Sequence, residues 1–200
     1  MEAVIFTGIP GSGKTSFYRT RFFDTHVRIS LDMLKTRRRE ELLFAACLEA
    51  AQPFVIDNTN PLASDRARYI QRSRDAGFKV VAYFFQSSLR DAMRRNAQRK
   101  LKQKIPVAAL GGIFKKLQPP ALVEGFDQIY TVEITADNAF EVRADGLTER
   151  VPALFIPGSR PLVACAHRQG KMGIIDDVRH DGSILLVKGS CDANLRICLQ

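Results

Sequence analysis

Apolar residues in the first two-thirds of the chain form short continuous runs, separated by longer amphipathic stretches. Continuous apolar runs predict buried strands, and apolar positions three and four residues apart predict helices. The expected strands are Ala3–Thr7, Val27–Ser30, Phe54–Asp57, Lys79–Phe85 and Gln128–Ile134. The expected helices are one from about Lys14, then Glu40–Ala51, Leu62–Ala76, Leu89–Lys104 and Val107–Leu117. This alternation predicts an α/β fold with a mostly parallel sheet flanked by helices.

The pattern changes after about residue 136. Proline and glycine punctuate the chain from Pro152 to Pro161, and two β-like runs follow at Leu162–Ala166 and Ile184–Val187. We therefore expect one domain over residues 1–135 and a C-terminal extension over residues 136–200. The extension is either a small β-rich appendage or a partly disordered tail, and it carries no catalytic motif.

The net charge also differs between the two parts of the chain. The formal net charge is +9; residues 1–135 hold 22 basic and 13 acidic side chains, whereas residues 136–200 hold eight of each. A basic domain favours an anionic partner, such as a nucleic acid, a nucleotide or a membrane surface. No apolar run is long enough to span a bilayer, and the N-terminus lacks the features of a signal peptide. We expect a cytoplasmic protein without a membrane partner.

The most specific motif is the segment GIPGSGKT at residues 8–15, which fits the P-loop pattern G-x-x-x-x-G-K-[ST] between a strand and a helix. Glycines in such a loop allow backbone N–H groups to surround phosphate oxygens, and the following helix N-terminus adds positive charge. Lys14 is expected to reach the β- and γ-phosphates of ATP, and the Thr15 hydroxyl to bind Mg²⁺. The expected ATP-binding residues here are Gly8, Pro10, Gly11, Ser12, Gly13, Lys14, Thr15 and Ser16.

Two carboxylates follow predicted strands. Asp32 is placed either to accept a proton from an acceptor hydroxyl or to cap the next helix, as Ser30 also could. Asp57 is placed either to hold Mg²⁺ or to form a turn with the polar residues Asn58, Thr59 and Asn60. The residues alone leave both pairs of alternatives open.

Basic residues gather in two places. The predicted helix Leu89–Lys104 includes Arg95 and Arg99, which are four residues apart and face the same way. They form either a clamp for the transferring phosphate or a solvated basic face. A second cluster, Lys35 with residues 37–39, follows Asp32 and forms either a site for an anionic acceptor or a solvated loop.

Four blocks of the sequence carry a family resemblance, namely Gly8–Thr15, Ile29–Lys35, Val55–Arg68, and Arg94–Arg99 followed by Ile105-Pro106-Val107. In this order they resemble the kinase domain of polynucleotide 5′-hydroxyl kinases, which are P-loop kinases. The third block is close to the animal repair kinases, and the segment Pro119–Ile129, with Glu124-Gly125-Phe126, is similar to the end of that domain. The resemblance covers about residues 3–135.

The resemblance implies a P-loop kinase core with a basic lid helix, and an enzyme that uses ATP and Mg²⁺. It implies that Asp32 is the general base for a 5′-hydroxyl of DNA or RNA, that Arg99 is the lid arginine, and that Asp57 completes the metal network with Thr15. Lys14 acts with Asp32 and Arg99 in catalysis, and Arg95 adds to the ATP site. The expected acceptor-binding residues are Lys35, Arg38, Asn58, Thr59 and Asn60.

The chain also departs from the family pattern. Lys35 stands where some members carry an arginine, and lysine cannot make the bidentate contact of a guanidinium with a phosphate. The D-x-D-x-T signature of the partner 3′-phosphatase is absent from the sequence. Two further hypotheses therefore stay open, namely a P-loop kinase of a small metabolite or nucleotide sugar, and a non-catalytic ATP-binding module.

Overall fold

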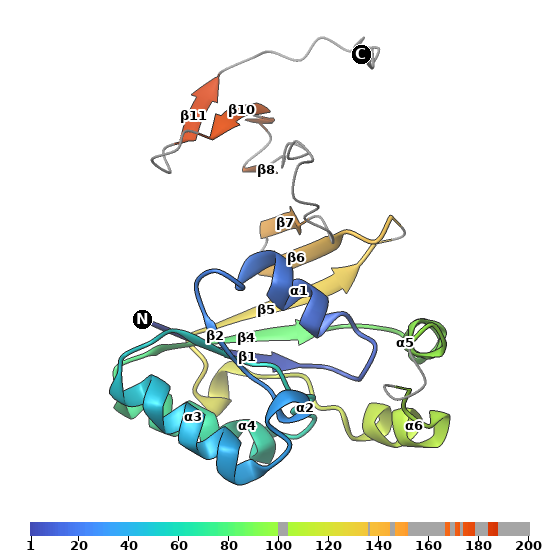
Figure 1. The fold of residues 1–200 in the computed structure, drawn as a ribbon. Coiled ribbons are helices and arrows are strands. Elements are labelled where there is room, and N and C mark those ends of the chain that lie inside the picture. The colour runs from blue at the N-terminus through green and yellow to red at the C-terminus, as the bar shows by residue number, and fades with distance from the viewer. Residues whose placement is uncertain are drawn as a thin grey trace.

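A seven-stranded sheet forms the centre of the molecule (Figure 1). The computed structural model describes residues 1–99, 104–135, 137–144 and 147–151, together with strand segments at 167–168, 171–172, 174–178 and 184–187. The spatial order of the strands is β2-β3-β1-β4-β5-β6-β7. Their bounds are Glu2–Thr7 (β1), Val27–Ile29 (β2), Phe54–Ile56 (β3), Lys79–Phe85 (β4), Gln128–Ile134 (β5), Phe140–Ala144 (β6) and Leu147–Val151 (β7).

The first five strands are parallel, and the last two are antiparallel. Val4 of β1 lies opposite Val55 of β3 on one side and Val81 of β4 on the other. The α/β class and the mostly parallel sheet predicted from the sequence are therefore confirmed. All five predicted strands are present, and β6 and β7 extend the sheet beyond them, so residue 135 falls between two strands of one sheet.

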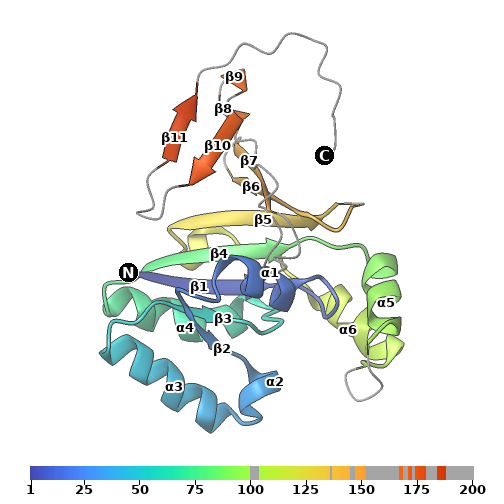
Figure 2. The same ribbon diagram turned by 45° about the horizontal axis from the view of Figure 1, so that its top comes forward.

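Helices cover both faces of the sheet, and two more lie beyond the carboxyl ends of its central strands (Figures 1 and 2). Helix α1 lies on one face, and α3 and α4 lie on the other. Helices α5 and α6 follow the carboxyl end of β4, on the side where α2 also lies. The helices are Lys14–Arg21 (α1), Leu31–Leu34 (α2), Arg37–Glu49 (α3), Ala63–Asp75 (α4), Leu89–Ala97 (α5) and Val107–Lys116 (α6), with the 3₁₀ turn Leu122–Glu124 (η2).

Alternate residues of each central strand fill two separate cores, because successive strand side chains point to opposite faces. On the α3–α4 face, Ile5 packs with Phe44 and Tyr69 among other buried residues. On the α1 face, Phe6 packs with Phe17, whose ring centroid lies 6.0 Å away. A strand buried on both faces reads as a continuous apolar run, which is why the sequence pattern predicted β1, β3 and β4 well.

The basic helix is shorter than the sequence predicts. The expectation of one helix over Leu89–Lys104 is wrong, because α5 ends at Ala97. The Asn96 side chain explains the change of direction. Its Nδ2 donates to Ile105 O at 2.8 Å, and its Oδ1 accepts from Ile105 N at 3.1 Å. These two bonds tie the end of α5 to Ile105, just before the start of α6.

Helix α3 begins at Arg37, three residues before the sequence predicts, because the Thr36 hydroxyl accepts the backbone N–H of Arg39 as an N-cap. In the C-terminal region the structure describes two antiparallel pairs, β8 (His167–Arg168) with β9 (Lys171–Met172), and β10 (Ile174–Val178) with β11 (Ile184–Val187). The predicted strand at Ile184–Val187 is confirmed. The one at Leu162–Ala166 lies outside the described residues. Among the helices that the structure describes, each is too short or too polar to cross a membrane.

A buried ion pair holds the site's supporting loops together. Arg66 of α4 is fully buried, and its guanidinium donates to both Glu124 carboxylate oxygens at 2.7 and 2.6 Å. The same group donates to the backbone oxygens of Asn60 and Gln118 at 3.1 and 3.0 Å. These contacts join two of the sequence blocks that resemble the kinase family, the block that ends in residues 66–68 and the block around Glu124.

Candidate active site

The P-loop connects β1 to α1 and is shaped by its glycines. Gly11 and Gly13 have φ values of 84° and 93°, which side-chain-bearing residues rarely adopt. A Cβ atom on Gly11 would lie 2.8 Å from the carbonyl oxygen of Ala92 in α5, and one on Gly13 would lie 2.7 Å from Ile134 Cδ1. The two glycines are thus required both by the backbone conformation and by close packing against neighbouring elements.

Lys14 is the first residue of α1, and its side chain turns back over the P-loop. Its Nζ donates to the carbonyl oxygens of Gly8 and Ile9 at 2.7 and 2.8 Å. Burial lowers the pKa of Lys14 to about 8; the carboxylates of Asp57 and Asp32 raise this pKa, and Arg99 lowers it further. The same charges that act on Lys14 are those of the other expected catalytic and metal-binding groups.

Thr15 and Asp57 are in direct contact, as the expected metal site requires. The Thr15 hydroxyl donates to Asp57 Oδ2 at 2.9 Å. Proteins typically hold Mg²⁺ through one or two carboxylates together with substrate phosphates, so a carboxylate and a hydroxyl at the P-loop fit this ion. The Arg28 side chain of β2 also donates to the same two oxygens, Asp57 Oδ2 and Thr15 Oγ1.

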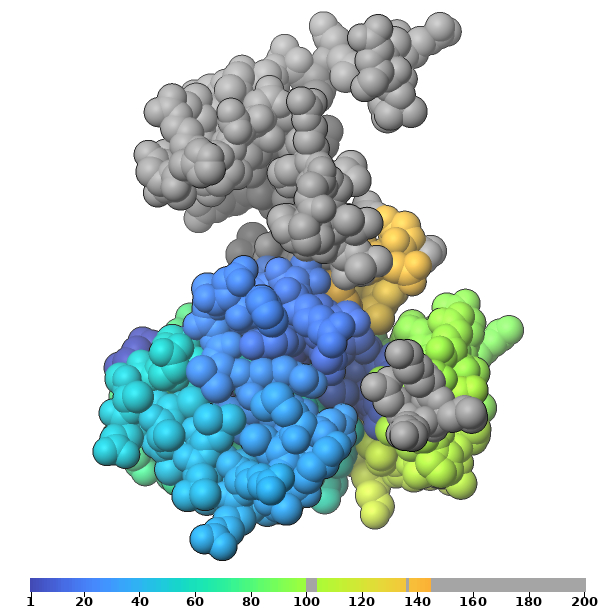
Figure 3. All heavy atoms as spheres, viewed as in Figure 1, coloured from blue at the N-terminus to red at the C-terminus, as the bar shows by residue number. Residues whose placement is uncertain are grey.

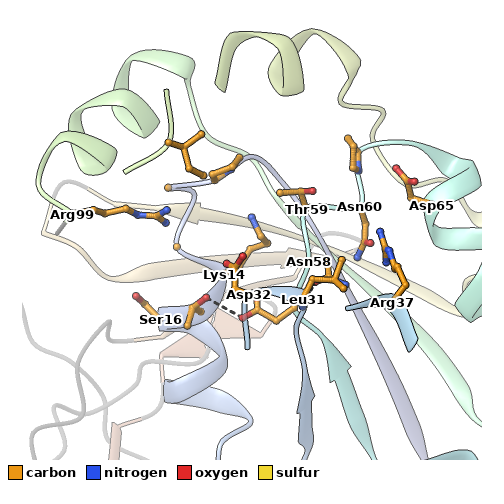
Figure 4. Close-up of a pocket in the computed structure, with 17 residues that line it drawn as sticks. Lys14, Ser16, Leu31, Asp32, Arg37, Asn58, Thr59, Asn60, Asp65 and Arg99 are labelled. Carbon is orange, nitrogen blue, oxygen red and sulfur yellow. Dashed lines mark hydrogen bonds between the residues drawn. The ribbon is translucent and has the colours of Figure 1, made fainter. Parts of the chain in front are cut away.

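Asp32 lies in the first turn of α2 and lines the same pocket as Lys14, Thr15 and Asp57. It is not the helix cap. Ser30 takes that position, and its hydroxyl makes no capping bond. Figure 4 shows Asp32 beside Lys14, with Arg99 on one side of the pair and Arg37 on the other. The geometry leaves the Asp32 carboxylate directed at the pocket rather than at its own backbone.

Asn58 fixes the position of α2 relative to the sheet. Its Oδ1 accepts the backbone N–H of Leu31 at 2.9 Å, and its Nδ2 donates to Glu40 Oε1 at 2.6 Å. The buried Glu40 carboxylate also accepts from Arg37 NH1 at 2.7 Å. One amide side chain therefore joins the turn after β3 to both helices that follow β2, and so fixes the start of α2, the helix that carries Asp32.

The three named residues of the Arg95-Asn96-x-x-Arg99 element make three different kinds of contact. Arg95 Nε donates to the Gly11 carbonyl oxygen at 2.6 Å, and its NH2 donates to Ser87 Oγ, so this side chain ties α5 to the P-loop. Asn96 ties the end of α5 to the backbone of Ile105. Arg99 lines the pocket, and Figure 4 shows its guanidinium directed toward Lys14.

The pocket has a volume of about 350 Å³ and gathers most of the expected residues. Of those expected residues, the ones that line it are Pro10, Gly11, Gly13, Lys14, Thr15, Ser16, Asp32, Asp57, Asn58, Thr59, Asn60 and Arg99. Those that do not are Gly8, Ser12, Lys35, Arg38 and Arg95. Figure 3 shows the yellow-green surface of α5 and α6 on one side of the molecule and the blue surface of the first third of the chain on the other.

On the side opposite Arg99, the structure places a different cation from those expected. Lys35 ends α2 with a φ of 67°, and its Nζ donates to the carbonyl oxygen of Asp32, so the side chain folds onto its own helix. Arg38 is exposed. Arg37 lines the pocket instead, held by Glu40 and by the Tyr69 hydroxyl at 3.1 Å.

The sequence interpretation also missed Arg28 and Glu40. One signal was available for each residue. Arg28 is a charged residue in the middle of a short apolar strand, and Glu40 lies on the apolar face of a predicted helix. Arg28 contacts Asp57, 29 residues away, and Glu40 contacts Asn58, 18 residues away, so neither contact could be inferred from residue spacing.

Comparison with known proteins bears on the family and the fold of this chain. A family model described as an AAA domain matches residues 4–120. The bifunctional polynucleotide phosphatase/kinase of Schizosaccharomyces pombe is 27% identical over 135 residues, which cover 66% of this chain and 33% of that protein. The chain thus spans about a third of that relative's length.

Two solved structures share the fold at low sequence identity. A gluconokinase from Sinorhizobium meliloti 1021 aligns with a TM-score of 0.50 and 17% identity over 67% of this chain and 83% of its own. A chain of the PezAT chromosomal toxin–antitoxin system of Streptococcus pneumoniae aligns with a TM-score of 0.50 and 13% identity over 70% of each. Since the family match covers more than half of the chain and includes the P-loop, the chain belongs to this AAA-domain family and has the fold of a P-loop kinase.

Proposed function

We propose that this protein is an ATP- and Mg²⁺-dependent kinase that transfers the γ-phosphate of ATP to the 5′-hydroxyl end of DNA or RNA. The observation that carries the proposal is the placement of Asp32 and Arg99 in one pocket with Lys14 and Thr15. A carboxylate and a set of cations around a P-loop are what phosphoryl transfer to an alcohol needs. The similarity to a polynucleotide phosphatase/kinase supports the choice of acceptor.

In the proposed reaction, Asp32 orients the acceptor hydroxyl and takes its proton. The hydroxyl oxygen forms a bond to the γ-phosphorus, and the bond from phosphorus to the β–γ bridging oxygen breaks, so that ADP leaves. Lys14 and Arg99 stabilise the negative charge on the transferring phosphoryl group. Thr15 and Asp57 would hold Mg²⁺, which supplies positive charge to the phosphates when bound.

Arg37 extends the proposal to the acceptor's own phosphate. It lines the pocket opposite Arg99, and its guanidinium is anchored by the buried Glu40 carboxylate. A guanidinium held in place can bind a phosphate oxygen pair with little loss of side-chain entropy. Arg37 is therefore proposed to bind the first phosphate beyond the 5′-nucleoside, the role that the sequence suggested for Lys35 or Arg38.

The test is incubation with γ-labelled ATP and three kinds of acceptor, namely 5′-hydroxyl DNA, 5′-hydroxyl RNA and small alcohols. Label on an oligonucleotide is expected, and its transfer should fall by at least about 100-fold in Asp32→Asn because a general base contributes on that order. Asp24→Asn, an exposed aspartate outside the pocket, is the matched control. Absence of label on every oligonucleotide would refute the acceptor assignment.

A second candidate is a kinase of a small hydroxyl compound. The pocket volume of about 350 Å³ favours it, because this size lies at the lower end of sites for small ligands. The salt dependence of acceptor binding distinguishes the two candidate functions. Binding of an oligonucleotide through several phosphates weakens steeply as salt rises, whereas the affinity for a neutral acceptor changes little. Nucleotide binding without transfer to any acceptor would instead indicate a non-catalytic ATP-binding module.

A further inference from the structure

Arg28 occupies a position in the site that the P-loop pattern does not account for. It is the middle residue of β2, and its side chain is 23% exposed. Two nitrogens of its guanidinium contact Asp57 Oδ2, Nε at 2.7 Å and NH2 at 2.6 Å. NH2 also donates to the Thr15 hydroxyl at 3.2 Å. One arginine thus contacts the same two side-chain oxygens that are expected to hold the metal ion.

The strand pairing and a ring hold this guanidinium in place. Strand β2 pairs with β3 in parallel register, with Arg28 opposite Val55 and the Asp57 N–H donating to Ile29 O at 2.8 Å. The guanidinium carbon lies 5.8 Å from the centre of the Tyr18 ring, a distance at which a cation is attracted to the ring face. Two independent restraints therefore direct Arg28 at Asp57.

The Asp57 side chain is only 2% exposed, and a buried carboxylate is strongly destabilising unless a positive group accompanies it. Arg28 supplies that positive charge from within the chain. A divalent cation bound to the same oxygens would meet the guanidinium at close range, and like charges at such distances repel.

We propose that Arg28 is an internal counter-cation of the metal site that competes with Mg²⁺ for Asp57 and Thr15. It thereby sets the Mg²⁺ concentration at which the metal–nucleotide complex binds. The inference rests on the proposed use of Mg²⁺ and ATP, but it does not depend on which acceptor is phosphorylated. Removal of the guanidinium should make the site easier for Mg²⁺ to enter.

The experiment measures ATP binding by titration calorimetry at a series of Mg²⁺ concentrations. Wild type is compared with Arg28→Met, which keeps an unbranched apolar chain over Tyr18 but removes the charge. In Arg28→Met the Mg²⁺ concentration for half-maximal enhancement of ATP affinity should fall about tenfold, the order expected for loss of one partly exposed charged hydrogen-bonded pair. Arg68→Met, an exposed arginine of α4 outside the pocket, is the matched control and should not change it.

Arg28→Lys provides a second variant for the case in which the methionine variant unfolds. Lysine keeps the charge but presents a single point of contact, so the Mg²⁺ midpoint should fall less than in Arg28→Met. A midpoint that is unchanged, or that rises, in a folded Arg28 variant would overturn the inference and leave the proposed kinase intact. Failure of wild type to bind ATP at every Mg²⁺ concentration would overturn the proposed function, and the inference with it.

Discussion

The buried P-loop lysine makes the stability of this protein depend on pH in a specific window. The pKa of Lys14 is lowered from 10.5 to about 8, first by burial and then by the positive charge of Arg99, while Asp57 and Asp32 act in the opposite direction. The folded protein therefore binds this proton more weakly than the unfolded chain does. Because burial disfavours its charged form, protonated Lys14 lowers the free energy of unfolding.

The sign and size of the effect follow from this difference in pKa. Between pH 8 and pH 10.5 the unfolded chain still holds the proton that folded Lys14 has released, so the free energy of unfolding rises with pH across this window. The two pKa values give a gain of about 2–3 kcal/mol between pH 7 and pH 10. Lys14→Met removes the titrating group, so the variant should lack this gain.

The assay is urea unfolding of wild type and Lys14→Met, without nucleotide, at four pH values from about 7 to 10. This range stays below the pKa of Tyr69, which burial raises to about 12. The difference in unfolding free energy between the two proteins should shift by about 2–3 kcal/mol in favour of wild type as the pH rises. Lys115→Met, an exposed lysine of α6, is the control. A difference that stays constant across the range would refute the assignment of the low pKa.

Three other predictions concern the contacts that support the site. Arg66→Met should lower the free energy of unfolding by about 3–5 kcal/mol in urea titrations, because it leaves the Glu124 carboxylate without its bidentate partner; a loss below about 1 kcal/mol would contradict this. Asn96→Ala should increase the rate of tryptic cleavage after Arg99 and Lys104 about tenfold or more, since each bond from Asn96 to Ile105 contributes about 1 kcal/mol, and an unchanged rate would contradict this role of Asn96. Asn58→Ala should lower the rate of phosphoryl transfer while the ATP affinity measured by calorimetry stays within about twofold, because it releases α2 but not the P-loop; an equal loss of both would contradict its positioning role.

The order of elements and the P-loop were predictable because their signals are local. Buried parallel strands are continuous apolar runs, and the P-loop needs glycine where φ is positive and the packing leaves no room for a Cβ atom. The end of α5 was not predictable in this way. It depends on the contact of Asn96 with Ile105, nine residues away, and such a tertiary contact overrides helix propensity.

The positions of the P-loop residues and the two carboxylates were predicted better than those of the cations around them. Most of the expected P-loop residues and both carboxylates line the pocket, because P-loop spacing and the carboxyl ends of strands fix where they lie. The cations at the sides depend on the local chain path. Lys35 takes a left-handed conformation at the end of α2, and the chain direction after it decides that Arg37 rather than Arg38 reaches the pocket. Arg28 required knowledge of strand order, because its partner Asp57 is 29 residues away.

The contact between the P-loop and β6 has a practical consequence for anyone shortening this chain. Phe140 Cε1 lies 3.0 Å from where a Cβ on Gly13 would stand, and the ring centroid of Phe140 is 5.1 Å from that of Phe17 in α1. A truncation at residue 135 would remove this buried ring, at a cost of about 3–5 kcal/mol by analogy with large-to-small core changes. It would also turn β5 into an open edge ready to pair with other chains. The smallest fragment worth expressing therefore ends after β7, although the residues that line the pocket all lie between Pro10 and Ile105.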